Sequence, residues 1–472
     1  MTTMERVQPG TFAADDVQLL AGKVRHGIVL PDDANYDEVR KVYNAMIDKR
    51  PAIIVRAGDV GEVIAAVAFA REHGLLLAVR GGGHNGPGLG TCDGGMMIDL
   101  SPLKGVRVDP VAKTARVGGG CTWADVDHAT HAFGLAAPSG IISTTGVGGL
   151  TLGGGLGHLT RKCGLAIDNL LEADIVLADG RFLTVNEREH ADLFWAIRGG
   201  GGNFGVVTSF LFRLHDVDTV YAGPMLWPMD QAADVLRWYK DFIVTAPEDL
   251  NGFFAFMVVP RGAPFPAELQ GQKVCGIAWC WTGSLNQADA TFAPIRKMFG
   301  TPALDWVGPI PHPALQGMFD GIYPPGQNWY WKADFVNEIP EEAIARHVEF
   351  GQKLPTDGAT MHLYPINGAA GRVAKEATAW NYRDANWAEV IVGVSPDPAD
   401  CDRMTQWARD YWAAIHPYTA GGAYVNMMME PADEGSDRVR NSYGANYDRL
   451  VAIKSKYDPT NLFRVNQNIK PR

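Results

Sequence analysis

The amino-acid sequence predicts an α+β protein whose two halves differ in character. Over about the first 215 residues, short strands alternate with helices and glycines gather in clusters. From about residue 219, glycine clusters become fewer, tryptophans become more frequent, and long apolar strands are accompanied by long helices. Antiparallel strands covered by helices on one side are the typical arrangement for such a pattern.

The first half opens with a strand–helix–strand unit. The apolar runs at 51–56 and 75–80 predict strands, and Asp59 with Glu62 three residues later is the pattern of a helix capping box. The helix is expected to end at Gly74. Further strands are predicted at 96–100, 106–109 and 114–118 in one mixed sheet and at 206–214, helices at 122–133 and 191–197, and a hairpin at 175–185 with an Asp179-Gly180 turn.

The second half repeats strands with long helices. Strands are predicted at 253–259, 274–281 and 388–394, and helices at 233–243, 288–299 and 401–415. The tail at 446–469 reads as a helix, a proline stop and a polar loop.

Composition indicates a soluble globular protein. The chain has 472 residues, 46% of them hydrophobic, and a mean hydropathy of -0.08. Its formal charge of -11 disfavours phosphate backbones and anionic membranes, so we expect neither a nucleic-acid nor a membrane partner. Residues 1–16 lack the apolar core of a signal peptide, and no run of about 18 apolar residues occurs. We therefore expect a cytoplasmic protein.

Cysteine and histidine spacing predicts neither disulfides nor a metal site. The six cysteines form no CxxC pair, which is typical of free thiols in a reducing compartment. His128 and His131 are three residues apart but have no third ligand nearby in the sequence, and no HExxH motif occurs.

Glycine gives the strongest compositional signal. The chain has 54 glycines, many of them in clusters at 81–90, 118–120, 146–157 and 199–205. Two clusters contain GxGxxG, but neither is followed by a helix, which a Rossmann dinucleotide site requires. The RGGGHN stretch instead presents a row of backbone N–H groups that suits phosphate oxygens. Four clusters within about 125 residues predict a large, extended ligand, and His84 lies among these glycines.

The ordered motifs resemble a known family. PAIIVRAGDVGEVIAAV, LLLAVRGGGHN, GGLTLGGGLGHLTRKCGLAIDNL, FWAIRGGGGNFGVVT and YDPTNLFRVNQNI occur in that order. The chain resembles the FAD-linked oxidases of the p-cresol methylhydroxylase and vanillyl-alcohol oxidase type, and within them the berberine bridge enzyme and 6-hydroxy-D-nicotine oxidase group. The resemblance implies a two-part FAD-binding domain (1–218), a substrate-binding α+β domain whose antiparallel sheet covers the flavin (219–425), and a C-terminal segment returning to the first domain (426–472).

The resemblance also implies a set of cofactor-binding residues. The RGGGHN loop is similar to the pyrophosphate loop whose histidine is joined to the flavin 8α-methyl carbon, which is His84 here. The other predicted residues are Gly81, Gly82, Gly83, Asn85 and Gly88 at the phosphates; Ser139, Gly140, Thr144, Gly149, Gly153, Gly154 and Gly157 along the ribityl chain and ring; Asn169, Val176, Gly205 and Val207 at the adenosine end; Asn466 and Asn468 over the flavin; and Arg80 and Gly146 in the same site.

One departure from the family concerns a second covalent link. Many members carry a cysteine just before the TVGVGG-like stretch, and here Ile142 takes its place. Cys163 lies elsewhere, where the family more often has an aromatic residue. We therefore expect FAD held by a single covalent bond, through His84.

The resemblance places the catalytic base on strands of the second domain, and several residues remain candidates. His362 and Tyr364 share one strand face, and Glu389 lies in an apolar strand where burial would raise its pKa. Tyr424 and Asn426 share a face, but Met427 stands where relatives often carry a catalytic tyrosine. We expect Tyr364 and Glu389 to act as base candidates and Tyr424 and His362 to line the pocket, with Tyr382 a weaker candidate; each is also compatible with a purely structural role.

These inferences predict an FAD-dependent oxidoreductase. Its substrate would be a small organic molecule, such as an alcohol, phenol, sugar, alkaloid or polyketide, that gives a hydride to flavin N5, with O2 reoxidising the flavin to form H2O2. A dehydrogenase using another acceptor and a non-catalytic flavin- or nucleotide-binding protein are the alternatives. Thr145 takes the position that gates oxygen in plant relatives, and aromatic residues at 323–331, with Trp380 and Trp387, predict an aromatic-walled cavity.

Overall fold

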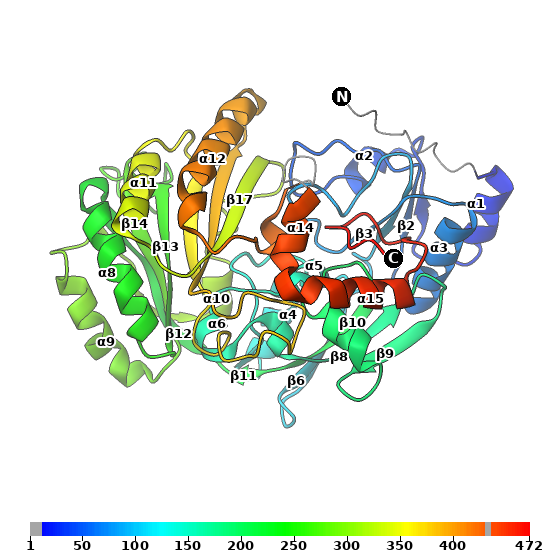
Figure 1. Cartoon of the computed structure of the whole chain (residues 1–472), viewed down its shortest axis with the longest axis horizontal. Coiled ribbons are helices and arrows are strands. Elements are labelled where there is room, and N and C mark those ends of the chain that lie inside the picture. Colours follow the sequence, from blue (N-terminus) through cyan, green and yellow to red (C-terminus); the bar gives the residue numbers. More distant parts are fainter. Residues whose placement is uncertain (1–11, 430–435) are drawn as a thin grey trace.

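A computed structural model describes residues 12–429 and 436–472, and it confirms the α+β class (Figure 1). In the described residues, the three larger sheets contain four, five and eight strands. The first two belong to the N-terminal half, which carries the glycine clusters, and the third to the second half. The functional cavity described below lies where the two halves meet.

The four-stranded sheet is mainly parallel. Its strands, in spatial order, are β1 (Ile28–Val29), β2 (Ile53–Arg56), β4 (Met96–Asp99) and β3 (Leu77–Arg80). Helix α3 (Val60–Glu72) links β2 to β3 and begins at Asp59, whose carboxylate accepts the Glu62 N–H at 3.0 Å. The second hydrogen bond of the predicted capping box, from the Asp59 N–H to the Glu62 carboxylate, does not form. The Glu62 carboxylate instead accepts the Gly58 N–H at 2.6 Å and pairs with His26 at 2.8 Å.

The five-stranded sheet is antiparallel. In spatial order it contains β5 (Val106–Asp109), β6 (Thr114–Gly118), β10 (Val206–Arg213), β8 (Leu170–Val176) and β9 (Phe182–Asn186). The single mixed sheet predicted for 96–118 is therefore wrong. Strand β4 is buried along its whole length and suits a covered parallel sheet, whereas β5 and β6 alternate in exposure and suit a sheet with one open face.

Short elements complete the first half. They are α1 (Ala14–Ala21), α2 (Tyr36–Val39), α4 (Trp123–His131), β7 (Leu135–Ala136), α5 (Val147–Gly153), α6 (Thr160–Cys163), α7 (Ala191–Ile197) and β11 (His215–Asp216). Helix α7 spans the predicted residues, and the predicted hairpin is the β8–β9 pair.

The eight-stranded sheet dominates the second half. Its strands are, in spatial order, β15 (Leu304–Asp305), β12 (Thr219–Pro228), β14 (Lys273–Trp281), β13 (Leu250–Val258), β18 (Thr360–Pro365), β19 (Trp387–Ser395) and β17 (Asn328–Val336), with β16 (Gly308–Pro311) pairing on β12. All of these pairings are antiparallel. The helices of this half are α8 (Ala232–Thr245), α9 (Leu285–Lys297), α10 (His312–Gln316), α11 (Glu341–Gln352) and α12 (Cys401–Ile415).

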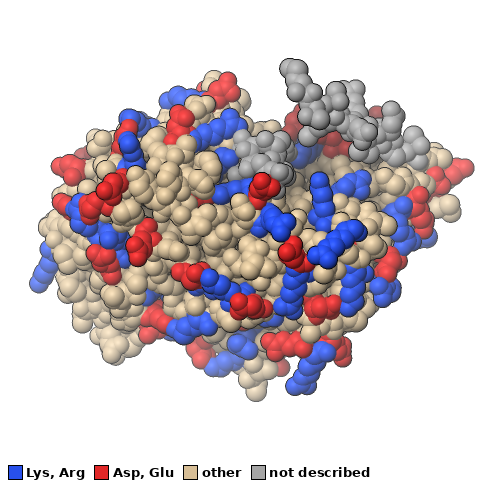
Figure 2. All heavy atoms as spheres, viewed as in Figure 1, with Lys and Arg blue, Asp and Glu red and all other residues tan. Residues whose placement is uncertain are grey.

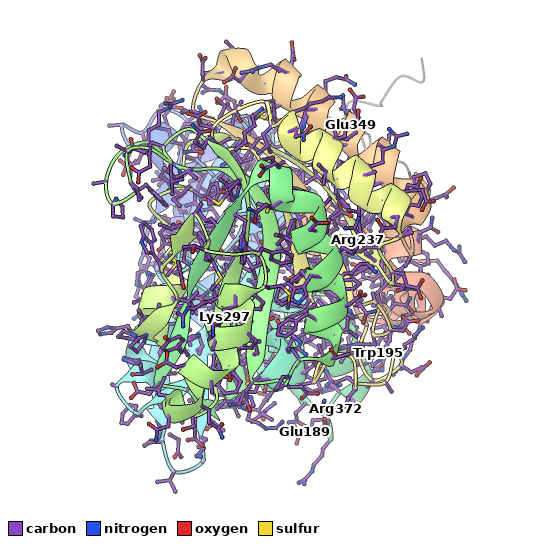
Figure 3. All side chains as sticks on the ribbon, turned by 90° about the vertical axis from the view of Figure 1, so that its left-hand side faces the viewer. Glu189, Trp195, Arg237, Lys297, Glu349 and Arg372 are labelled. Carbon is purple, nitrogen blue, oxygen red and sulfur yellow. The ribbon has the colours of Figure 1, made fainter. Side chains whose placement is uncertain are left out.

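Long helices cover the outer face of this sheet (Figure 1). Helix α12 packs on β17 and β19, and α8 packs on β13 and β14. Arg237, labelled on α8 in Figure 3, pairs with Glu341 of α11 at 2.7 Å on the outside of the layer. One face of the sheet is thus taken up by helices, which leaves the other face for the first half of the chain.

Two segments join the halves. The loop at 366–386 reaches the first half, where the Arg383 guanidinium binds both carboxylate oxygens of Asp168 at 2.7 and 2.8 Å. The C-terminal helices α14 (Ser436–Tyr443) and α15 (Tyr447–Tyr457) return to the first half, and Lys456 pairs with Asp192 of α7 at 2.7 Å. A buried ion pair thus links the second half to the first, and a surface ion pair links the C-terminal segment to the first half.

The surface is mixed in charge. Figure 2 shows acidic and basic side chains interspersed over the displayed face. In the part of the chain that the structure describes, no helix is both long and apolar enough to span a bilayer.

Candidate active site

A cavity of about 310 Å³ lies between the glycine-rich loops and the inner face of the eight-stranded sheet. Its lining includes residues of the loops at 81–85, 140–146 and 201–205, of helix α5, of the start of β10, of strands β17, β18 and β19, and of the segments 424–427 and 463–467. The 81–85 loop follows the carboxyl end of β3, the end of a parallel strand at which α/β proteins usually bind ligands.

Two glycine loops touch each other through bare backbone. A Cβ on Gly82 would lie 2.3 Å from the backbone nitrogen of Gly146, and a Cβ on Gly146 would lie 2.2 Å from that of Gly82. Gly83 has φ +71°, which favours glycine. A Cβ on Gly149 would meet nothing within 4 Å, because this backbone borders the cavity. The floor is therefore formed largely by backbone, including N–H groups that suit phosphate and carbonyl oxygens.

His84 lines the cavity in a tightly defined position. Its ring stacks on Tyr43 with centroids 3.9 Å apart and planes 20° apart. The hydroxyl of Thr144 lies 3.0 Å from Nε2, and that of Thr145 lies 3.3 Å from Nδ1. Burial lowers the pKa of His84 to about 4, so the imidazole is neutral at pH 7 and keeps one nitrogen lone pair.

The sheet side of the cavity is set by strand alternation. Thr360, Val392 and Trp331 lie in one cross-strand row, and His362 and Val390 pair in the next. All five line the cavity. Because side chains alternate between faces, the intervening residues of each strand point toward the helices.

His362 and Tyr364 form a hydrogen-bonded pair in the cavity wall. The Tyr364 hydroxyl lies 2.5 Å from Nδ1 of His362. Phe253 packs on both rings, with centroids 5.1 and 5.0 Å away. Burial lowers the pKa of His362 to about 3 and raises the pKa of Tyr364 well above its usual value, so both side chains are neutral at pH 7.

Tyr424 and Asn426 close another part of the cavity. The Tyr424 hydroxyl accepts the Gly155 N–H at 2.9 Å and the Asn426 amide N–H at 2.7 Å. A Cβ on Gly153 would lie 2.1 Å from the amide oxygen of Asn426, and one on Gly154 would lie 2.3 Å from the Trp380 ring. The strand predicted here is wrong, since 425–427 form a short 3-10 helix, yet the two side chains remain adjacent.

The structure brings many of the predicted site residues to the cavity. Those in its lining are Gly81, Gly82, Gly83, His84, Asn85, Gly140, Gly146, Gly149, Gly205, Val207, His362, Tyr364, Tyr424 and Asn466. Those outside the lining are Arg80, Gly88, Ser139, Thr144, Gly153, Gly154, Gly157, Asn169, Val176, Glu389 and Asn468.

Residues outside the lining make contacts within the protein. Arg80 pairs with Asp99 at 2.9 Å beneath the 81–85 loop. Gly88 has φ +65°, and a Cβ there would lie 2.5 Å from Ile47. These contacts support the shape of the loop, while direct cofactor binding by Arg80 and Gly88 stays a prediction.

Gly157 and Asn169 contact backbone carbonyl oxygens of the first half. A Cβ on Gly157 would lie 2.3 Å from the Ser139 carbonyl oxygen. The Asn169 amide donates to the carbonyl oxygens of Cys163 and Leu165 at 2.8 and 3.0 Å.

The adenosine-end and C-terminal predictions lie nearby. Val176 is fully buried on β8, and a Cβ on Gly205 would lie 2.6 Å from its carbonyl oxygen. The side-chain oxygen of Asn468 is buried and has no hydrogen-bond partner among the described residues.

Glu389 does not reach the cavity, and its assignment as a base candidate is corrected. It pairs across the strands with Leu363, one position out of phase with His362 and Val390. It therefore faces the helices, where Oε1 lies 3.8 Å from Nδ1 of His347. Burial raises the pKa of Glu389 well above its usual value, as predicted, but on the wrong face for contact with a substrate.

Some of the other residues expected near the cavity line it, and others do not. Ile142 lines the cavity, whereas Cys163 is buried in a separate apolar cluster with Leu159 and Val217. Among the predicted aromatic wall, Tyr323, Trp329 and Trp331 line the cavity. Trp380 packs instead on Tyr424, with ring centroids 4.9 Å apart, while Trp387 and Tyr382 lie outside the lining.

Two residues that line the cavity and hold neighbouring groups in place, Tyr43 and Asn203, were not identified from the sequence. Tyr43 stacks on His84 but lies in a stretch without a motif, so no sequence signal could have identified it. Asn203 stands within a glycine cluster, which was an available signal. Its amide donates to the Gln467 carbonyl at 3.2 Å and its oxygen accepts the Ile469 N–H at 3.0 Å, so it fixes the C-terminal segment over the cavity.

These residues fit FAD. The glycine loops offer backbone N–H donors for a pyrophosphate, and the open backbone at Gly149 leaves room for a flat ring. His84 is neutral and faces the same cavity. The donor set and the shape thus agree with an extended dinucleotide.

Comparison with known proteins agrees with this fit. A family model described as FAD binding domain matches residues 51–186, and one described as berberine and berberine like matches residues 423–470. An FAD-linked oxidoreductase of Dictyostelium discoideum is 32% identical over 437 residues, covering 92% of each chain. The solved structure of 6-hydroxy-D-nicotine oxidase from Arthrobacter nicotinovorans is 27% identical with a TM-score of 0.84, over 95% of this chain and 98% of that one. Berberine bridge enzyme from Eschscholzia californica, at 22% identity and a TM-score of 0.86, covers 97% of this chain and 99% of its own and shares the fold.

The fold and the cavity define a flavin-binding enzyme. This chain belongs to the family of FAD-linked oxidoreductases of the berberine bridge enzyme type. The predicted family, fold class and oxidoreductase activity are therefore confirmed.

Proposed function

We propose that the protein is an oxidase that holds FAD through one covalent bond, from His84, and oxidises a small organic molecule at the expense of O2. The observation that carries this proposal is the position of His84. Its neutral ring is fixed by Tyr43, Thr144 and Thr145 at the edge of a backbone cradle. Ile142 lines the same cavity where a cysteine would be needed for a second link.

The proposed reaction balances without further reagents. Bound FAD would supply the two-electron acceptor for a substrate carbinol, the protein would take the carbinol proton, and O2 would finally take up two electrons and two protons to give H2O2. The product is the corresponding carbonyl compound. The protein must therefore hold the substrate C–H against the cofactor and accept a proton from the substrate hydroxyl.

The His362–Tyr364 pair is the proposed proton acceptor. The raised pKa of Tyr364 argues against a tyrosinate in the resting enzyme, and the lowered pKa of His362 argues against a resting imidazolium. The neutral pair can instead pass a proton along its hydrogen bond during turnover. Tyr364 oxygen would receive the substrate proton while its own proton moves to Nδ1 of His362, and the imidazolium so formed, short-lived because of its low pKa, would give this proton up to the reduced oxygen.

The relatives support an oxidase in general terms. The solved relative at 27% identity is named a nicotine oxidase, and its substrate is a small molecule. The cytoplasmic location predicted from the sequence remains part of the proposal, and cell fractionation tests it.

Flavin fluorescence in an acid-treated denaturing gel tests the covalent bond. The wild type should give a fluorescent band and His84→Ala none, whereas His128→Ala, which changes an exposed histidine on α4, should keep the band. Fluorescence retained in His84→Ala would place the link elsewhere. Oxygen consumption with stoichiometric H2O2 supports an oxidase; turnover only with an artificial acceptor dye would identify a dehydrogenase.

A further inference from the structure

The sheet side of the cavity is divided into two kinds of wall. Trp329 and Trp331 on β17 and Val390 and Val392 on β19 give it a continuous aromatic and aliphatic surface. Tyr323 packs on Trp329 with ring centroids 5.5 Å apart and extends the aromatic part. Flat apolar walls of this kind bind planar rings.

Charged residues of the same strands lie on the other face. Lys332 and Asp334 of β17 alternate with Trp331, and Asp334 pairs directly with Glu389 of β19. That face is covered by the α12 region, where Asp334 accepts from Nδ1 of His416 at 2.6 Å. Strand alternation thus sends the charge of β17 and β19 to the helices and presents neutral side chains to the cavity.

Hydrogen-bonding groups on the sheet wall are few. The Nε1–H groups of Trp329 and Trp331 are buried and have no hydrogen-bond partner among the described residues. The Thr360 hydroxyl is already used, because it donates to the Phe256 carbonyl at 2.7 Å. The His362–Tyr364 pair lies beside Val390, directly across the strands. A ligand on this wall therefore finds the His362–Tyr364 pair and two indole N–H donors on an otherwise apolar surface.

We propose that the substrate is an uncharged planar aromatic molecule that carries a hydroxyl group, with its ring on the Val390 and Trp331 surface and its hydroxyl at the His362–Tyr364 pair. The inference rests on the proposed function and narrows its substrate class. An ammonium or carboxylate group would be desolvated against this wall without a partner of opposite charge, which is strongly unfavourable. A sugar would bring hydroxyl groups to all its edges, more than this pair and two indole N–H donors can satisfy, and unpaired buried hydroxyls weaken binding.

The test compares near-isosteric probes that carry no oxidisable carbinol. 2-Naphthol, 2-naphthoate and N-methylquinolinium are titrated at pH 7 into the purified holoenzyme, and binding is followed by the change in flavin absorbance. D-Glucose, the sugar probe, carries oxidisable carbinols and is therefore titrated separately, with its binding measured as competition against 2-naphthol. We expect 2-naphthol to bind at least ten-fold more tightly than either charged probe. His362→Phe should weaken 2-naphthol about ten-fold, the loss of one hydrogen bond, and His128→Phe should leave it unchanged.

The outcomes separate the two proposals. Covalent flavin together with tighter binding of naphthoate, methylquinolinium or glucose would overturn the substrate class and leave the FAD-dependent function standing. Equal binding of 2-naphthol by wild type and His362→Phe would overturn the anchor. A protein without flavin would overturn the proposed function itself, and the substrate class with it.

Discussion

Replacing Asp127 by asparagine tests a buried carboxyl group on α4. Asp127 is 2% exposed, and neither carboxyl oxygen has a hydrogen-bond partner among the described residues. Nδ1 of His312 lies 3.9 Å from Oδ1, beyond hydrogen-bond distance. Burial raises the pKa of Asp127 to about 8 and lowers the pKa of His312 to about 4, so both side chains are neutral near pH 7.

The raised pKa makes stability fall as pH rises. In the unfolded chain Asp127 ionises above its usual value of 3.8, whereas in the folded chain it keeps its proton up to about pH 8. The contribution of Asp127 to the free energy of unfolding is complete below pH 3.8. It is lost between pH 3.8 and pH 8 at about 1.4 kcal/mol per pH unit, which amounts to about 4 kcal/mol by pH 7. Asparagine cannot ionise and has nearly the same shape. The variant should therefore match the wild type near pH 4 and exceed it increasingly toward pH 8.

Thermal unfolding at a fixed scan rate, measured at several values between pH 4.5 and 8, checks this difference. Asp127→Asn should melt several degrees above the wild type at pH 7.5 and nearly with it at pH 4.5. Asp125→Asn on the same helix is the control and should lower the melting temperature at pH 7.5. The Asp125 carboxylate accepts the Thr122 N–H at 2.8 Å and its pKa is lowered, so its ionised form stabilises the folded chain. If Asp127→Asn lowered the melting temperature at pH 7.5, Asp127 would be ionised and paired with His312, and the reasoning would be refuted.

Three further substitutions test the cavity. Gly82→Ala should abolish flavin incorporation, because its Cβ would overlap the Gly146 backbone. Flavin content is measured by absorbance at about 450 nm, where the free cofactor absorbs. A full complement of flavin in this variant would contradict the close approach of the two loops. Glu389→Gln should keep turnover within about two-fold, since the neutral carboxyl faces the helices; a loss beyond about ten-fold would restore it as a base. Tyr424→Phe should keep the flavin but lower the unfolding free energy by about 1–3 kcal/mol, because the Asn426 amide and one backbone N–H lose their acceptor; unchanged denaturation midpoints would argue against those bonds.

The glycine-rich side of the cavity was largely predictable from the sequence. Gly82 and Gly146 contact each other through their backbones, and a Cβ at either position would overlap the other loop, so the close approach of the two loops appears directly in the sequence as clustered glycines. The same logic extends to Asn203, an amide among glycines that binds the C-terminal segment. Tyr43 differs, because a single aromatic residue in a loop carries no pattern, and only the folded chain brings it against His84.

The substrate half was harder to predict because its residues lie in strands buried on both faces. Strand β19 is buried at every position, so neither hydropathy nor alternation along the sequence tells which side chains face the cavity. Register decides it: Val390 is opposite His362, and Glu389, one residue earlier, is opposite Leu363. A single-residue shift of β19 against β18 would bring the carboxyl group to the cavity and turn Val390 toward the helices.

The register of β19 against β18 therefore determines which functional group the cavity contains. A carboxyl group in the cavity would supply a base and a partner for a cationic substrate at once, whereas valine supplies a surface for a ring. The observed register leaves proton transfer to the neutral His362–Tyr364 pair, which is also the anchor proposed for the substrate hydroxyl. Reactivity and specificity would then depend on the same hydrogen bond, so His362→Phe should reduce binding of a hydroxylated ring and its oxidation together, while Glu389→Gln should alter neither.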